Sequence, residues 1–275
     1  GDVVEPGTAV ILERRPEQAQ LGHLRDEFVR KAALLEAIGD DRQHALVDEA
    51  KIHLRDNMLH LKAVDPANVA MVDQSLGAKA FESYDADGGV IGVNLEWLGD
   101  VLSMGDSDSL VHLELNEETR KLQIEVDGLS YTLALIDPDS IRQEPDIPDL
   151  DTNGEAYLEG RDLDRAVTAA DLVSDHIALG FDVDGGYLYA DAEGDTDDVH
   201  FELDGEDDLL PGSSFDADAR TLLSLDYMND LKKPIDAETE VEVEIGTELP
   251  VKLHYRYADD SGSVTNMVAP RIQSN

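Results

Sequence analysis

The chain has 275 residues, and its 62 acids against 21 bases leave a formal net charge of −41. Cysteine is absent, which excludes disulfides and thiolate metal sites. No apolar run approaches the length of a membrane span and the N-terminus lacks the layout of a signal peptide, so we expect a soluble, intracellular protein.

The acids are spread along the chain and form no single block. Because concentrated salt screens the repulsion between surface charges, this distribution indicates adaptation to high salt. An ordinary acidic protein with acidic or cationic partners is the alternative. The sign of the charge therefore says little about what the protein binds.

From Lys51 onward the pattern is mostly that of strands. Apolar residues alternate with polar ones, and Gly and Asp mark the turns between segments, which is typical of sheets with one solvated face. The eleven strand segments are 51–54, 58–64, 111–115, 121–126, 130–136, 176–183, 187–192, 199–203, 240–245, 251–257 and 263–269.

Three helices interrupt these strands. The clearest is Asp162–Ser174, whose apolar residues recur at helical spacing. Two shorter helices follow natural N-caps, one after Asn94 over 95–104 and one after Ser224 over 225–233.

The order of these elements repeats along the chain. The helix at Leu225 follows the helix at Leu95 by 130 residues (225 minus 95), and the strand residues Leu122 and Val251 are 129 apart. A nearly constant offset indicates two similar β-rich domains. Between them lies Ile136–Asp151, which holds three of the ten prolines and predicts a stiff connector, because proline fixes φ and cannot join a sheet interior.

No constellation of catalytic residues stands out. Acids are too numerous for one pair to be singled out, and there is no glycine-rich phosphate loop and no paired metal-ligand histidines. We interpret the histidines on strands as structural: His53, His60, His112, His200 and His254. The sequence therefore gives little support to an enzyme, and an acidic hydrolase is a distant alternative.

One segment partly matches a calcium loop. Asp149–Glu159 has oxygen ligands at the expected early positions, but the final position is Gly160 where a bidentate glutamate belongs. Asp85–Gly89 is a weaker case. We favour a turn leading into a strand at Asp149–Glu159, and keep an acidic β-rich calcium- or ligand-binding module as the alternative function.

Four segments together resemble the archaeal sliding clamp, proliferating cell nuclear antigen, of the halophilic type. They are AVDPANVAMVD (63–73), FESYDADGGVIGVNL (81–95), LALIDPDSIRQEPDIPDLD (133–151) and VAPRIQSN (268–275), and the resemblance covers about residues 45–275. It implies an α+β fold of two similar β-rich domains in a ring-shaped homotrimer, with sheets outside and helices lining a central hole.

The resemblance also implies a function. The ring encircles duplex DNA without an active site, cofactor or metal, and tethers DNA polymerase, the clamp loader, flap endonuclease and DNA ligase. Such a protein would lie in the cytoplasm, associated with the nucleoid. A closed ring can hold DNA without phosphate contacts, so a net charge of −41 does not prevent binding. Phosphate contacts would hold little in concentrated salt, because binding that depends on counterion release weakens steeply with salt.

The domain boundaries follow from this resemblance. We predict a divergent extension at residues 1–27, a first domain at 28–135, a connecting loop at 136–152 and a second domain at 153–275. Residues 1–44 match poorly. Phe28 would correspond to the start of the family, and Leu34–Leu46 to its first helix.

Three sets of site residues are carried over from the family. An apolar groove for partner peptides would comprise Val64, Val69, Met71, Ile147, Pro148, Pro250, Met267, Val268, Ala269 and Pro270. The DNA-facing cations would be Arg161, Arg165, Lys232 and Lys233, with Arg30, Lys31 and Arg42 added if the N-terminal match holds. The subunit interface would pair Leu122, Ile124 and Val126 with Val199, Phe201 and Leu203 of the next subunit.

Each set has a plainer interpretation. The groove residues could be ordinary core, and the cations could be solvated helix residues paired with nearby acids. Glu125 and Glu202 would lie in or near the subunit interface, where only salt screening makes them tolerable. We therefore expect the ring to loosen in dilute salt.

Overall fold

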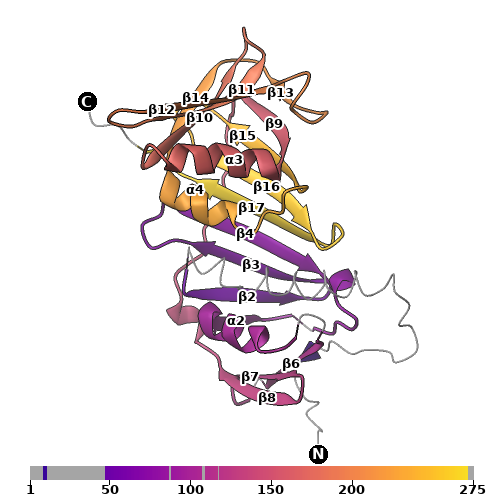
Figure 1. Ribbon diagram of the computed structural model, residues 1–275. Helices are drawn as coiled ribbons and strands as arrows, with labels where there is room; N and C mark the ends of the chain where they lie inside the picture. Colours follow the sequence, from indigo (N-terminus) through magenta and orange to yellow (C-terminus); the bar gives the residue numbers. More distant parts are fainter. Residues whose placement is uncertain (1–8, 11–46, 87, 107–108, 117, 272–275) are drawn as a thin grey trace, which may run out of the picture. The chain divides into compact units, whose positions relative to one another are not determined.

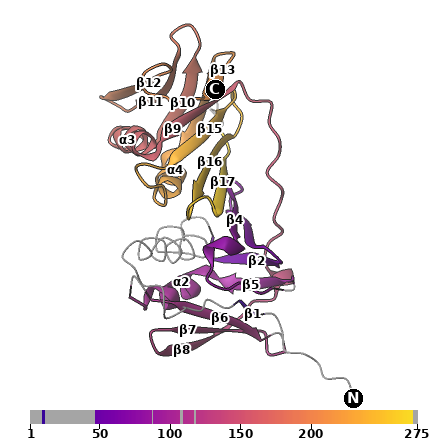
Figure 2. The same ribbon diagram turned by 90° about the vertical axis from the view of Figure 1, so that its right-hand side faces the viewer.

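The computed structural model in Figures 1 and 2 describes residues 9–10, 47–86, 88–106, 109–116 and 118–271. Phe28, the helix Leu34–Leu46, the cations Arg30, Lys31 and Arg42 and most of the predicted extension lie outside the described residues. In the described part of the chain, no helix is both long and apolar enough to cross a membrane.

The chain divides into two compact units. Unit 1 comprises Gly1–Ala63, Gln74–Glu144 and Tyr257–Ser263, and unit 2 comprises Val64–Asp73, Pro145–Arg256 and Val264–Asn275. The elements up to the connector are β1 (Ala9–Val10), β2 (Glu49–Arg55), β3 (Met58–Val64), β4 (Ala70–Gly77), β5 (Val90–Asn94), α2 (Leu95–Ser103), β6 (Val111–Asn116), β7 (Lys121–Val126) and β8 (Leu129–Ala134). Short 3-10 turns occur at Ala78–Ala80 and Pro138–Ser140.

The elements after the connector repeat much of this order, and α3 and β13 have no counterpart among the elements described before it. They are β9 (Gly154–Glu159), α3 (Gly160–Asp171), β10 (His176–Asp182), β11 (Tyr187–Glu193), β12 (Asp198–Asp204), β13 (Ser214–Phe215), β14 (Ala219–Ser224), α4 (Leu225–Lys232), β15 (Glu240–Ile245), β16 (Val251–Tyr257) and β17 (Gly262–Val268). Helices α2 and α4 start 130 residues apart, as the sequence predicts. The domain boundaries themselves stay predictions.

In unit 1, β6, β7 and β8 form an antiparallel sheet with β1 paired to β6, and β2 pairs with both β3 and β5. The side chains of Leu122, Ile124 and Val126 on β7 point into the core, because they alternate with exposed residues along the strand. Helix α2 begins where the Asn94 side chain accepts a hydrogen bond from the Trp97 amide at 2.8 Å, which confirms the predicted cap.

In unit 2, a sheet of order β12-β11-β10-β14 lies beside strands β13, β9, β15 and β16 (Figure 1). Helices α3 and α4 pack next to each other. Phe181 of β10 stacks on Phe215 of β13 with ring centroids 4.7 Å apart, so the two groups of strands share one core.

All eleven predicted strands are present, but the helix ends and several strands differ from prediction. Helix α3 starts two residues before Asp162, because the Gly160 and Arg161 amides bond to the Thr239 and Ala237 carbonyls directly after β9. Ser224 occupies the N-cap of α4 without a side-chain hydrogen bond. Strands β4, β5, β13 and β14 were not predicted as strands, whereas the turn and strand expected over Asp149–Glu159 are confirmed by β9.

Candidate functional site

An apolar cluster in unit 2 joins segments far apart in the sequence. Val64, Met71 and Met267, from β3, β4 and β17, are buried to 8–9% exposure, and Ile147 and Leu150 of the connector pack against them half-buried. The structure thus brings together four residues of the predicted groove. Leu150 is an addition that the prediction lacked, although it follows Ile147 at a spacing of three.

The remaining predicted groove residues differ in burial. Val69, Pro250, Ala269 and Pro270 are half-buried, and Pro148 is exposed. Val268 is fully buried at 0% exposure, because alternation along β17 turns its side chain inward, so it belongs to the core and cannot contact a partner.

A buried carboxylate organises the loop beside this cluster. Asp65, 4% exposed, accepts hydrogen bonds from the amides of Ala67 (2.8 Å), Val69 (2.6 Å) and Ala70 (2.7 Å). The Val69 carbonyl in turn accepts from the Ala269 amide at 2.7 Å. Asp65 therefore fixes the backbone between Val64 and Met71, and the same loop fixes the segment after β17.

The fourth partner of Asp65 comes from helix α4. The Tyr227 hydroxyl donates to its Oδ2 at 2.8 Å. Burial opposes the charge of Asp65, but the hydrogen bonds from Ala70, Tyr227, Ala67 and Val69 outweigh it and hold the pKa below the ordinary value. Burial and the adjacent Asp65 carboxylate raise the pKa of Tyr227 to about 12. The pair is therefore an anion held by a neutral phenol.

The connector is tied to unit 1 at Glu144 by a hydrogen bond and an ion pair. Glu144 Oε2 lies 2.8 Å from His53 Nε2 and Glu144 Oε1 lies 3.6 Å from Lys51 Nζ, both on β2. The Glu144 side chain is only 11% exposed, so salt screens this contact less than a surface pair. The connector is thus anchored at Glu144 within unit 1 and again at Ile147 and Leu150 within unit 2.

The four predicted DNA-facing cations of α3 and α4 all have acidic partners. Arg161 Nε lies 2.6 Å from Glu159, Arg165 Nη1 3.9 Å from Asp162, and Lys233 Nζ 2.6 Å from Asp230. Their side chains are 48–70% exposed. These three cations therefore remain on the surface with their charge largely balanced.

Lys232 differs from the other three. Its Nζ donates to Asp164 Oδ1 at 2.7 Å and to Thr168 Oγ1 at 2.5 Å, both on α3, and its side chain is 14% exposed. It bonds α4 to α3 instead of projecting outward. The expectation that Lys232 faces DNA stays a prediction, and its amine is already engaged by α3.

The strand pairing contradicts the β7 half of the predicted subunit interface and is compatible with the β12 half. β7 pairs with β6 on one side and β8 on the other, so Leu122, Ile124 and Val126 belong to a central strand and point into the core. Both sides of β7 are hydrogen-bonded within the subunit, so this strand cannot pair with a neighbouring subunit. Among the described strands, β8 pairs only with β7 and β12 only with β11, which leaves one free edge on each.

The two edge strands present similar faces. On β8, Leu129 and Tyr131 are each 37% exposed and share a face with the buried Leu133. On β12, Val199 and Phe201 are half-buried and share a face with the buried Leu203. Each edge therefore ends an apolar layer that continues the core of its own sheet.

His200 lies on the opposite, polar face of β12. Its Nδ1 is 2.5 Å from Asp191 and its Nε2 is 2.6 Å from Glu202. Both ring nitrogens can donate only in the imidazolium, so these two carboxylates raise the pKa of His200 above its ordinary 6.5. All five strand histidines that we interpreted as structural have a polar side-chain partner.

We expect the free energy of unfolding to depend on pH through His200. A raised folded-state pKa gives stabilisation that is complete below 6.5 and is lost as pH rises through the folded value. Urea unfolding in concentrated KCl should show a midpoint that falls over this window, and His200→Gln should abolish the fall. His254→Gln, which removes a histidine bonded to the Thr265 hydroxyl, is the control and keeps it. An unchanged slope in His200→Gln would contradict this.

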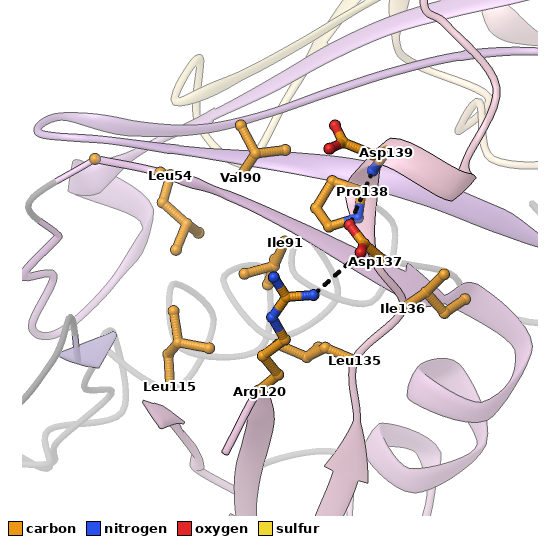
Figure 3. A pocket seen from close by; sticks show the side chains of 13 residues that line it. Leu54, Val90, Ile91, Leu115, Arg120, Leu135, Ile136, Asp137, Pro138 and Asp139 are labelled. Atoms are coloured by element: carbon orange, nitrogen blue, oxygen red, sulfur yellow. Dashed lines mark hydrogen bonds and ion pairs between the residues drawn. The ribbon is translucent and has the colours of Figure 1, made fainter. Parts of the chain in front are cut away.

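A cavity of about 470 Å³ lies in unit 1 and contains none of the predicted groove residues. Figure 3 shows Arg120 pointing to Asp137, and the lining also includes the apolar side chains of Leu115 and Leu135. The Arg120 Nη1 to Asp137 Oδ2 distance is 3.2 Å, so the cation is already balanced. Within the described ranges, no group of three or more His, Asp or Glu residues is arranged to hold a metal ion.

Comparison with known proteins adds independent observations. Residues 26–139 match the family described as "Proliferating cell nuclear antigen, N-terminal domain". The DNA polymerase sliding clamp of Natronomonas pharaonis is 62% identical over 237 residues, which cover 86% of this chain and 94% of that protein. That of Haloarcula marismortui is 60% identical over 236 residues, with 85% and 94% covered.

Solved structures are also similar. The A. fulgidus PCNA, solved with the C-terminal region of FEN-1 bound, superposes with a TM-score of 0.78 at 30% identity over 98% of this chain and all of that one. The PCNA of Thermococcus kodakaraensis gives 0.77 at 26% identity, over 96% of this chain and 100% of that one.

Proposed function

The chain belongs to the proliferating cell nuclear antigen family of DNA polymerase sliding clamps, and from this we propose that three copies close into a ring around duplex DNA. It is a processivity factor and not an enzyme. As a replication clamp it acts in the cytoplasm or nucleoid of an archaeal cell. This function replaces the alternative of an acidic calcium- or ligand-binding module.

The observation that carries the ring is that the edge strands β8 and β12 both present an apolar face. β8 and β12 are different strands of the same chain, so pairing β8 of one copy with β12 of the next is head-to-tail and can close into a ring. In an antiparallel pairing, Leu129, Tyr131 and Leu133 would extend the apolar layer formed by Val199, Phe201 and Leu203 of the next copy. Two cores would then merge across each interface, and both edges would be covered.

Encirclement, and not electrostatic attraction, keeps the clamp on DNA in this proposal. The subunit charge of −41 and the paired cations of α3 and α4 leave little electrostatic affinity for phosphates. A closed ring needs none, because it leaves DNA only at an end or by opening. Repulsion between three such subunits is also why we expect the ring to loosen in dilute salt.

The apolar cluster is the proposed partner site. A buried base of Val64, Met71 and Met267 with Ile147 as a side wall suits a short peptide whose aliphatic and aromatic side chains insert as anchors. The A. fulgidus relative was solved with the C-terminal region of FEN-1 bound. We infer that DNA polymerase, the clamp loader, flap endonuclease and DNA ligase bind here.

Retention on DNA tests the proposal. The clamp is mixed with a linear duplex in concentrated KCl, the ends are then blocked with streptavidin, and free protein is removed on a sizing column. We expect the clamp to remain on the blocked duplex and to be lost from the same duplex with open ends. Equal retention on both, or loss from both, would contradict encirclement.

A further inference from the structure

We propose that Asp65 and Tyr227 are positioning residues for peptide binding, through which helix α4 sets the shape of the apolar cluster. This inference rests on the proposed function of the cluster. Neither polar group is expected to touch the peptide, because Asp65 is 4% exposed and the Tyr227 hydroxyl donates to its carboxylate together with the three loop amides.

The loop is closed by two backbone hydrogen bonds, from the Asp65 amide to the Ala70 carbonyl and from the Asn68 amide to the Asp65 carbonyl, both at 3.0 Å. Between Val64 and Met71 only Ala70 lies in a strand, and Asn68 adopts a left-handed backbone conformation with φ of 58°. The Asp65 side chain adds to this backbone closure by accepting from the Ala67, Val69 and Ala70 amides of the same loop. A displacement of Asp65 would therefore shift Val64 and Met71, which provide two of the three buried residues of the cluster.

The two carboxylate oxygens have different partners. Oδ1 accepts from the Val69 and Ala70 amides, whereas Oδ2 accepts from the Ala67 amide and the Tyr227 hydroxyl. Without the hydroxyl, Oδ2 retains one of these donors at a buried position, which is a costly arrangement for an ionised group. The carboxylate would then turn or draw in water, and the Ala67 side of the loop would loosen.

The same loop connects to the other wall of the cluster. The Val69 carbonyl accepts from the Ala269 amide at 2.7 Å, and Ala269 follows the strand that carries Met267. The contact from Tyr227 of α4 to Asp65 thus helps to fix the β3–β4 loop and, through Val69, the segment after β17. Lys233, the C-cap of the same helix, is a surface cation, so α4 connects a surface charge with the anchor of the loop.

The test is Tyr227→Phe, which deletes one hydroxyl and keeps the ring. A synthetic peptide with one aliphatic and two aromatic anchors is titrated by calorimetry into each ring in concentrated KCl. We expect the Kd to rise about 10-fold with stoichiometry unchanged. Tyr187→Phe is the matched control, because its hydroxyl donates to Asp182 Oδ2 at 3.1 Å in the β10–β11 hairpin; its Kd should stay within about 2-fold of wild type.

A pH profile separates positioning from general loss of stability. Acidification protonates Asp65 and should weaken the binding of the peptide to the ring. Without the Tyr227 hydroxyl the pKa of Asp65 rises, so the weakening should begin at higher pH in Tyr227→Phe and at the wild-type pH in Tyr187→Phe. Asp65→Asn, which cannot ionise, should bind weakly at every pH.

The outcomes are distinct. Wild-type affinity and pH profile in Tyr227→Phe would overturn the inference alone, as would equal weakening by Tyr187→Phe. No peptide binding by the wild-type ring would overturn the proposed function of the cluster, and the inference with it.

Discussion

Tyr131→Glu should convert the ring to monomers in concentrated KCl. Tyr131 is 37% exposed on the apolar face of the edge strand β8, where the proposed pairing brings it against Phe201 of the next copy. A carboxylate buried against the Phe201 ring loses its hydration, and salt screens its repulsion without removing this desolvation cost. Three interfaces carry the change at once, so we expect association to weaken at least about 100-fold.

The measurement is mass by light scattering across a protein dilution series. Gln123→Glu is the control, because it adds the same charge on the exposed face of β7, one strand inside the edge. It should keep the wild-type mass. A Tyr131→Glu protein that also kept the wild-type mass would show that the subunits meet elsewhere.

Ile147→Asp should abolish peptide binding while the ring stays intact. Ile147 is a half-buried side chain of the connector that packs on Val64, Met71 and Met267, and the connector has no strand or helix there to disrupt. The change removes an apolar wall and places a charge in the groove, so we expect the Kd of the anchor peptide to rise about 100-fold or more.

Val183→Asp is the matched control for this variant. Val183 is a 38% exposed apolar residue after β10 in unit 2, and it is not part of the apolar cluster. Calorimetry should give wild-type peptide affinity for Val183→Asp and none measurable for Ile147→Asp, with equal mass for both. Unchanged affinity in Ile147→Asp would place the peptide away from the connector.

The alternation of apolar and polar residues and the N-cap residues of the helices were enough to predict most of the fold. The strands that were not predicted have physical reasons. In β14, Thr221 is 1% exposed because its hydroxyl donates to the Gly246 and Leu249 carbonyls, so a polar residue occupies a core position and breaks the pattern. In β4, the buried Gln74 has the same effect. Tertiary hydrogen bonds of this kind leave no trace in local sequence.

Edge and central strands also look alike in sequence. β7 alternates as cleanly as any strand, but alternation reports which face is buried and says nothing about how many neighbours a strand has. That β8 is the edge became visible only from the strand pairing and from the exposure of Leu129 and Tyr131. For the cluster, family motifs supplied Ile147 and Met267, whereas the role of Asp65 was visible only once Tyr227 lay beside it.

The central claim is a closed ring of three, and its most direct test is the solution mass in concentrated KCl by light scattering on a sizing column. The account predicts three times the 30.1 kDa subunit mass, constant across protein concentration. A mass equal to one subunit at every concentration would contradict it.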